Sequence, residues 1–150
     1  MATNPSVTPA ASRAVLEGSF PGDLGIELVE IGDDRVVGRL TVDRRHLHPG
    51  GYVHGGVWTA LGDTVAAWAT FRNIPKGHNF TTIELKLNVF SAGLPDDEIV
   101  ATAEPLHVGR STVVIEVRME CLRESSEPKL AANLIVSQFV LAPRSEGPSR

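Results

Sequence analysis

Residues 55–71 read GGVWTALGDTVAAWATF, and Asp63 is the only charged residue among them. The segment is long enough for four or more helical turns and too long for one strand. A helix that is apolar nearly all round is buried, so this pattern predicts one long helix in the interior of the fold. Two faces of that helix differ in the size of their side chains. One face carries larger residues, namely Val57, Leu61, Thr64, Val65, Trp68 and Phe71, and the other carries the small residues Gly56, Ala60 and Ala67.

The segments on either side of this helix show the alternation of β-strands. In residues 80–90, for example, apolar residues alternate with Glu84, Lys86 and Asn88. Strands are predicted at residues 26–31, 35–42, 80–90, 98–108, 111–122 and 129–141, and a short helix at residues 10–20. Short turns between the four later strands favour an antiparallel meander. The prediction is an α+β fold: a curved antiparallel β-sheet wrapped around one long central helix, with a short N-terminal helix.

The length of 150 residues suits one domain with one core. Residues 1–12 and 143–150 are predicted to be flexible tails around a single domain at residues 13–142. The net charge of −4 offers no basic field for nucleic acid or a membrane. Because the sequence shows no long apolar run and no signal peptide, we expect a cytoplasmic protein. The single cysteine, Cys121, is predicted to be a buried strand residue.

Asp63 is the residue that points to chemistry, because a lone carboxylate in an apolar helix is costly unless it is hydrogen-bonded, paired or protonated. A structural aspartate bonded to a neighbouring group is the simpler interpretation. The start of the helix favours a functional one. Gly55 and Gly56 are poor helix formers, and a first helical turn offers unpaired N–H donors at the positive end of the helix dipole. Such donors suit the oxyanion that develops on an ester or thioester carbonyl during attack.

The loop before the helix contains His46, His48 and His54 together with Gly50 and Gly51. This composition fits a rigid loop that faces a ligand better than it fits a solvated connection. Three histidines also suggest a metal site, but no ligand motif of fixed spacing is present. We therefore expect neither a metal nor a cofactor.

The separation between the helix start and the acid sets a geometric limit. Gly55 and Asp63 are eight residues apart, which is about 12 Å along a helix. A nucleophile or base and an oxyanion hole must meet within about 3 Å of one reacting atom. One copy of the helix therefore cannot supply both, whereas a twofold dimer with two antiparallel helices would form two equal sites.

The pattern His54-Gly55-Gly56, six further residues and then Asp63, after a strand and a Pro-Gly loop, resembles the hotdog-fold acyl-CoA thioesterases. It is most similar to the branch with the PaaI-like, hydroxynaphthoyl-CoA and 4-hydroxybenzoyl-CoA thioesterases. The resemblance covers residues 24–142 and includes the order of strands and helix. It implies hydrolysis of an acyl-CoA thioester to a free acid and CoA.

The resemblance implies a role for each residue of the motif. Asp63 matches the acid that acts as nucleophile or general base on the thioester. Gly55 matches the residue whose backbone N–H binds the carbonyl oxygen, supplied by the neighbouring subunit, and His54 matches the histidine that braces this turn. His48 stands where the family usually has Asn or Gln, a side chain that helps to place the carbonyl or a water molecule.

Other positions carry weaker expectations. Ala67 stands where several relatives have Ser or Thr, so the hydroxyl that orients water is expected from Thr82 or Thr81. Arg110 and Ser111, in the turn after residue 108, are candidates for the nucleotide end of CoA, although a solvated turn is nearly as good an interpretation. The predicted substrate-binding set is Gly56, Thr82, Thr81, Asn88, Arg110 and Ser111.

The expected partners are the acyl-CoA substrate and further copies of the chain, as a homodimer or as a homotetramer made of two dimers. Nucleic acid and membranes are not expected. Two alternatives share the fold. The first is a domain that binds acyl-CoA without hydrolysing it, and the second is an acyl dehydratase or hydratase. Release of CoA would favour hydrolysis, and a change at an enoyl absorbance band without thiol release would favour a dehydratase.

Overall fold

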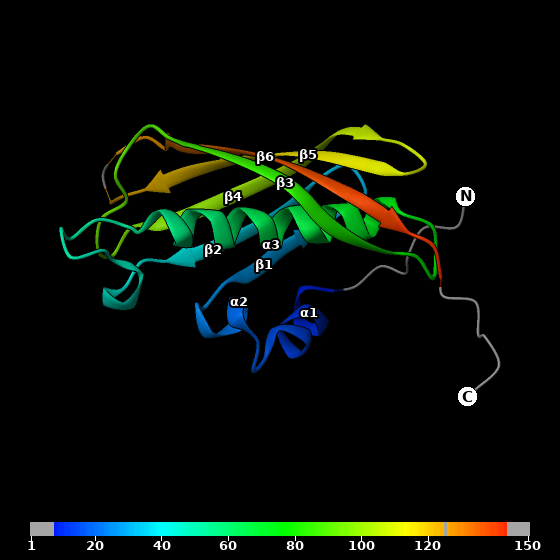
Figure 1. Cartoon of the computed structure of the whole chain (residues 1–150). Helices are drawn as coiled ribbons and strands as arrows, with labels where there is room; N and C mark the ends of the chain where they lie inside the picture. The colour runs from blue at the N-terminus through cyan, green and yellow to red at the C-terminus, as the bar shows by residue number, and fades with distance from the viewer. Residues whose placement is uncertain (1–7, 125, 144–150) are drawn as a thin grey trace.

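The computed structural model describes residues 8–124 and 126–143, and it confirms the predicted α+β fold. A curved, six-stranded antiparallel sheet wraps around the long helix α3, which lies in its concave face (Figure 1). The elements are α1 (Pro9–Leu16), α2 (Phe20–Asp23), β1 (Glu27–Ile31), β2 (Val36–Thr41), the 3-10 helix η1 (Arg44–His46), α3 (Gly55–Asn73), β3 (Asn79–Val89), β4 (Glu98–Val108), β5 (Thr112–Leu122) and β6 (Lys129–Leu141).

The strand order in the sheet is β1-β2-β4-β5-β6-β3, with every pair antiparallel. The predicted meander is right for β4, β5 and β6 and wrong for β3, which pairs with β6 and not with β4. Only residues 74–78 separate α3 from β3. This link is short, so β3 begins beside the end of the helix, at an edge of the sheet, and residues 90–97 then carry the chain across to β4.

Helix α3 packs on the sheet through both large and small residues. Leu61, Val65 and Ala66 are fully buried. At Gly62 an added Cβ would lie 2.5 Å from Leu134 on β6, so this glycine sets how closely helix and sheet approach. Of the residues on the predicted small face, Ala60 is buried, whereas Gly56 is exposed and Ala67 is half-buried.

The N-terminal segment forms two short helices where the sequence predicted one. α1 ends at Leu16, and Gly18 has a φ of +68°, a conformation that favours glycine. Ser19 then caps α2, so the Phe20-Pro21 step begins a helix and does not end one. Because α1 begins at Pro9, residues 9–12 belong to a helix and not to the predicted tail. The rest of both predicted tails, apart from Thr8 and Pro143, lies outside the described residues.

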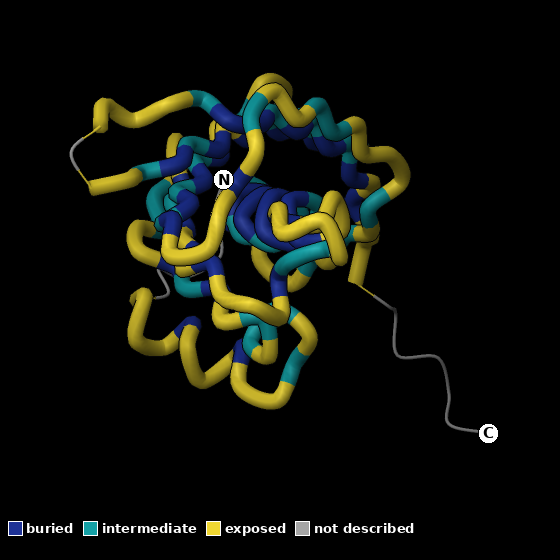
Figure 2. The backbone as a smooth tube through the Cα atoms, turned by 90° about the vertical axis from the view of Figure 1, so that its left-hand side faces the viewer, coloured by how far each residue is buried: buried dark blue, intermediate teal, exposed yellow. Residues whose placement is uncertain are grey.

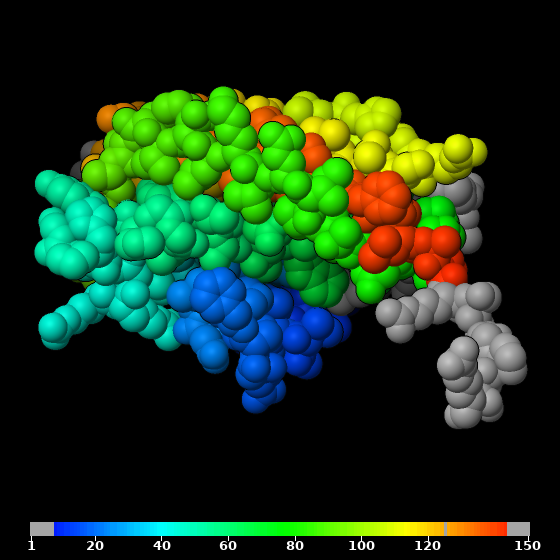
Figure 3. Space-filling model, in the orientation of Figure 1, coloured from blue at the N-terminus to red at the C-terminus, as the bar shows by residue number. Residues whose placement is uncertain are grey.

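The burial of the chain is uneven around α3. Figure 2 shows the helix near the centre of the molecule, enclosed by the sheet over most of its circumference. The side that packs least carries the exposed Gly55 and Gly56 and the half-buried Thr59, Asp63 and Ala67. Figure 3 shows α3 uncovered between β3 on one side and α1 and α2 on the other.

Strand β3 is an edge strand whose middle is exposed. Its four residues from Ile83 to Lys86 are all exposed, with Ile83 at 59% and Leu85 at 37%. A bulge interrupts the pairing with β6 between Thr82 and Glu84. An edge strand presents unpaired N–H and C=O groups, to which a strand of another chain can pair.

Within the described residues, no helix is both long and apolar enough to cross a membrane. Cys121 is confirmed as a buried strand residue. Burial raises the pKa of its thiol to about 11, and the nearby Asp97 acts in the same direction. The thiol is therefore not ionised at neutral pH and is a poor nucleophile.

Candidate active site

Asp63 lies in the third turn of α3, half-buried and facing strand β3. The Thr82 hydroxyl donates a hydrogen bond to its Oδ1, with 3.2 Å between the two oxygens. Burial raises the pKa of the Asp63 carboxyl, and the Thr82 hydrogen bond partly offsets this. A carboxyl group with such a pKa, beside an open surface, has the properties of a catalytic base or nucleophile.

The first turn of α3 leaves one backbone donor available. The Gly56 N–H donates to His54 Nδ1 at 2.9 Å, and the N–H groups of Val57 and Trp58 both donate to the His54 carbonyl. In the described part of the chain, the Gly55 N–H has no acceptor. Gly55 is exposed, and a Cβ added to it would meet no atom within 4 Å, so the surroundings of this residue are open. This is the arrangement that an oxyanion-binding N–H needs.

His54 and His48 each use one ring nitrogen to accept a hydrogen bond from a backbone N–H two residues further along the chain. His54 is the N-cap of α3, and its Nδ1 accepts from Gly56. His48 Nδ1 accepts from the Gly50 N–H at 2.8 Å. Since an accepting Nδ1 carries no proton, the neutral imidazole of His48 has its N–H at Nε2. That N–H is the group through which His48 can donate a hydrogen bond.

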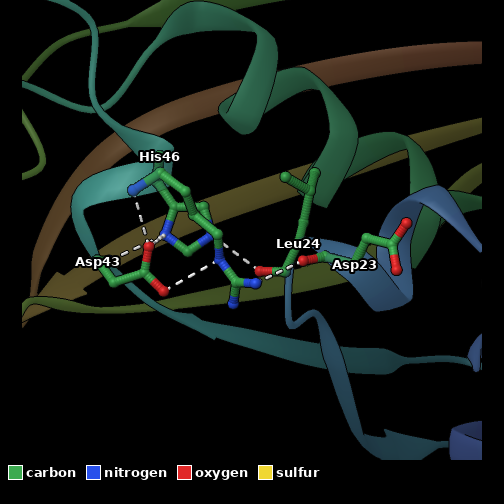
Figure 4. A network of polar contacts seen from close by, with 5 residues as sticks. Asp23, Leu24, Asp43 and His46 are labelled. Atoms are coloured by element: carbon green, nitrogen blue, oxygen red, sulfur yellow. Dashed lines mark hydrogen bonds and ion pairs between the residues drawn. The ribbon is translucent and has the colours of Figure 1, made fainter.

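His46 has a structural role that explains one of the three loop histidines. It is fully buried; its Nδ1 accepts from the Asp43 N–H at 2.9 Å, and its Nε2 lies 2.8 Å from the Leu24 carbonyl (Figure 4). The Nδ1 contact to the Asp43 carboxylate, at 3.4 Å, is therefore not an ion pair, because the acceptor Nδ1 bears no proton. Both ring nitrogens are engaged, so His46 fixes the loop against the segment after α2 and is not a metal ligand.

Of the other residues predicted to bind substrate, Thr82 contacts Asp63, and the rest do not. Thr82 reaches Asp63, whereas Thr81 is exposed and takes the opposite side of β3 by strand alternation. Asn88 lies beyond the bulge, paired with Asn133, on the face of the sheet turned away from α3. Arg110 and Ser111 are exposed in the turn between β4 and β5.

Gln138 belongs to the site and was not predicted. It is fully buried on β6, and its Nε2 donates to Thr82 Oγ1 at 3.3 Å. The sequence held a signal for it: Leu134, Val136 and Val140 occupy the buried positions of β6, and Gln138 is the only polar residue in phase with them. A buried amide in an apolar row needs a partner, and this pattern could have directed attention to it.

The structure also contains a groove of about 730 Å³ between α1, α2 and β1. None of the predicted site residues lines it. The acids that line the groove are the exposed Glu17 and Asp23 and the half-buried Glu27, whose carboxylate is paired with Arg39, so the groove lacks the reactive arrangement of Asp63 and Gly55.

The chain matches the family model described as the thioesterase superfamily over residues 50–125. It is 35% identical over 97 residues to a putative esterase, ComA2, of Bacillus subtilis, covering 64% of this chain and 76% of that protein. It is 32% identical over 99 residues to the 1,4-dihydroxy-2-naphthoyl-CoA hydrolase of Listeria monocytogenes, covering 64% and 77%. A thioesterase structure from Haemophilus influenzae superposes with a TM-score of 0.87 at 23% identity, over 97% of this chain and 99% of that one.

The chain belongs to the thioesterase superfamily and has the hotdog fold. It is a thioesterase, and its relatives support the predicted hydrolysis of an acyl-CoA thioester.

Proposed function

We propose that the chain hydrolyses acyl-CoA thioesters with Asp63 as nucleophile or general base and the Gly55 N–H as oxyanion donor. The observation that carries the proposal is the half-buried Asp63, with a raised pKa and a hydroxyl partner, on the same open flank of α3 as the Gly55 N–H, which has no acceptor among the described residues. In this proposal His48 serves as a second donor to the carbonyl through Nε2, the role that its place in the motif implies, and His54 maintains the first turn through its bond to Gly56.

Two routes are open to the carboxylate. In the first, Asp63 attacks the thioester carbon, the CoA thiolate leaves, and water then hydrolyses the mixed anhydride and frees the carboxylate. In the second, Asp63 takes a proton from a water molecule that attacks the same carbon, and the departing thiolate receives that proton. Both pass through an oxyanion that the Gly55 N–H would stabilise.

The proposed site is shared between two chains. Along straight α3, Gly55 and Asp63 remain about 12 Å apart, too far to act on one carbonyl. Antiparallel pairing of β3 with the β3 of a second copy would cover the exposed segment from Ile83 to Lys86. The same twofold axis would set the two α3 helices antiparallel, so that each Gly55 faces the other chain's Asp63.

The midpoint between the two half-sites gives a direct test of this dimer. Thr59 lies four residues from both Gly55 and Asp63 and is half-buried. Two copies of Thr59→Cys would therefore lie close to the twofold axis and be joined by a short bismaleimide. The native Cys121 is buried, and this burial raises its pKa to about 11, so it should react far more slowly than a cysteine on the surface.

The matched control is Thr41→Cys, on an exposed position of β2. Rapid cross-linking of Thr59→Cys and none of Thr41→Cys supports the proposed dimer. A monomer mass in solution, or equal cross-linking of both variants, would reject it. The mass also distinguishes the homodimer from the homotetramer of two dimers that the sequence allows.

The activity itself is tested with a panel of aryl-CoA and aliphatic acyl-CoA esters. CoA release is followed with a thiol-reactive dye, and Asp63→Asn is the control. Release by the wild-type chain and not by Asp63→Asn supports the proposal. Binding without release would identify an acyl-CoA-binding domain, and loss of enoyl absorbance without thiol release would identify a dehydratase or hydratase. The expected cytoplasmic location remains a prediction, which fractionation of cells would check.

A further inference from the structure

The buried amide of Gln138 occupies a place that packing alone does not explain. Gln138 is paired with Thr82 on β3 and with Val113 on β5, so it is enclosed by strands on both sides. Its side chain is on the helix side of the sheet, in a row whose other members are aliphatic. Burying a polar amide in such a row costs free energy unless its groups are hydrogen-bonded.

Only half of this amide is satisfied. Nε2 donates to Thr82 Oγ1 at 3.3 Å, whereas Oε1 is buried with no hydrogen-bond partner among the described residues. An aliphatic or thioether side chain of similar size would avoid that cost. The residue is therefore unfavourable for stability, and such a feature beside a reactive group indicates a role in function.

The hydrogen bonds around Thr82 have a defined direction. A hydroxyl has one proton and can accept from other donors. Because Gln138 Nε2 donates to Thr82 Oγ1, the single Thr82 proton is left for Asp63 Oδ1, 3.2 Å away. The amide also polarises the hydroxyl and strengthens that second bond, since donors in a chain reinforce one another.

The bulge in β3 supports this arrangement. The register shift lies between Thr82 and Glu84, directly after the residue that contacts both Asp63 and Gln138. Bulges re-aim side chains next to active sites. Here the bulge follows a Thr82 that faces the helix, and Ile83 is left at the exposed edge.

We propose that Gln138 is a positioning residue for Asp63, which acts by holding the Thr82 hydroxyl as a donor to the carboxylate. The inference rests on the proposed role of Asp63 in thioester hydrolysis. Gln138 does not touch the substrate in this account. It keeps one carboxylate oxygen fixed, so that the other oxygen faces the thioester carbon or the attacking water.

The test is Gln138→Met, which keeps the volume and removes the donor. We expect kcat to fall by about two- to tenfold, the range for loss of one neutral hydrogen bond, with KM within about twofold of the wild type. The melting temperature should stay equal or rise, because the unsatisfied Oε1 is removed with the donor. Gln138→Leu provides the same measurement should the methionine variant fail to fold.

The second arm is a double-mutant cycle with Thr82→Val. If Gln138 acts through Thr82, adding Gln138→Met to Thr82→Val causes no further loss of kcat. The matched control is Asn133→Met, also an amide on β6, which donates to Glu116 on the other face of the sheet. Its kcat should be unchanged.

Three outcomes would overturn the proposal: wild-type kcat in folded Gln138→Met, an equal loss of kcat in the Thr82→Val background, or an equal loss in Asn133→Met. The failure of the proposed function has a different signature. In that case Asp63→Asn keeps its full turnover, whatever the Gln138 variants do.

Discussion

The first turn of α3 and its third turn contribute to the proposed site in different ways. At the first turn the functional group is a backbone N–H, at an exposed glycine with open space in front of it. At the third turn it is a half-buried side chain, held by Thr82 from β3 and through it by Gln138 from β6. The first therefore depends on local sequence alone, and the second depends on the assembled sheet. Variants at the two turns should fail in different ways.

The largest effect is expected at the third turn. Asp63→Asn should lower kcat by about 10²–10⁴-fold, because it removes the base or nucleophile. Burial raises the folded-state pKa of Asp63, so folding favours its protonated form, and this stabilisation is lost as pH rises through the folded pKa. At pH 7 the ionised group therefore costs stability, and Asp63→Asn should melt at an equal or higher temperature. A large fall in the melting temperature would show that Asp63 is structural.

At the first turn, Gly55→Pro should lower kcat by about 10²–10³-fold, the usual cost of one oxyanion donor. Proline removes the backbone N–H of residue 55 and is favoured at the first position of a helix. The preceding residue, His54, has a ψ of 142°, an extended conformation that is compatible with a following proline. Gly55→Ala is the control, because it keeps the N–H and its Cβ meets no atom within 4 Å. Equal activity losses in the proline and alanine variants would argue against an oxyanion role.

A smaller effect is expected at Thr82, which joins the third turn to the sheet. Thr82→Val should reduce kcat about tenfold, as for loss of a hydrogen bond to a charged group. Burial and Thr82 are the two causes of the Asp63 pKa shift, with no charged side chain contributing. Removing the hydroxyl raises the pKa further, so the acidic limb of the kcat–pH profile should move to higher pH. An unmoved limb with lower kcat would separate Thr82 from the ionisation of Asp63.

The smallest effect is expected at His54, the cap of the first turn. His54→Ala should cost about 1 kcal/mol of unfolding free energy, because the Gly56 N–H loses its acceptor. The Gly55 N–H remains, so kcat should fall less than in Gly55→Pro. Denaturant unfolding and steady-state kinetics measure the two quantities. A loss as large as that of Gly55→Pro would make His54 part of the catalytic machinery.

Much of the fold was predictable because its signals are local. The uninterrupted apolar run around Asp63 gave the central helix, and alternation gave each strand to within a few residues. The place of β3 in the strand order was not predictable in this way, because the sequence of residues 80–90 does not indicate which strand it pairs with. The break at Gly18 was missed because Ser19 and Pro21 fit both the end of one helix and the start of the next.

The residues of the candidate site also separate into those with local sequence signals and those that depend on contacts between distant segments. Gly55, His54 and Asp63 were found because their spacing is fixed within one element. The choice of Thr82 over Thr81 required the strand's orientation. The link from Gln138 to Thr82 joins two residues 56 positions apart in the chain, and it forms only when their strands become neighbours. A buried polar residue in phase with an apolar strand was the one sequence signal for it.

The central claim is that each site combines Gly55 of one chain with Asp63 of another, and heterodimers of two inactive variants test it most directly. Asp63→Asn and Gly55→Pro chains with different affinity tags are co-expressed, and the doubly tagged dimer is purified. Such a dimer has one site with both native groups and one with neither, so the account predicts about half of the wild-type activity per dimer. A purified heterodimer as inactive as either parent would contradict the account, because the two groups would then have to come from the same chain.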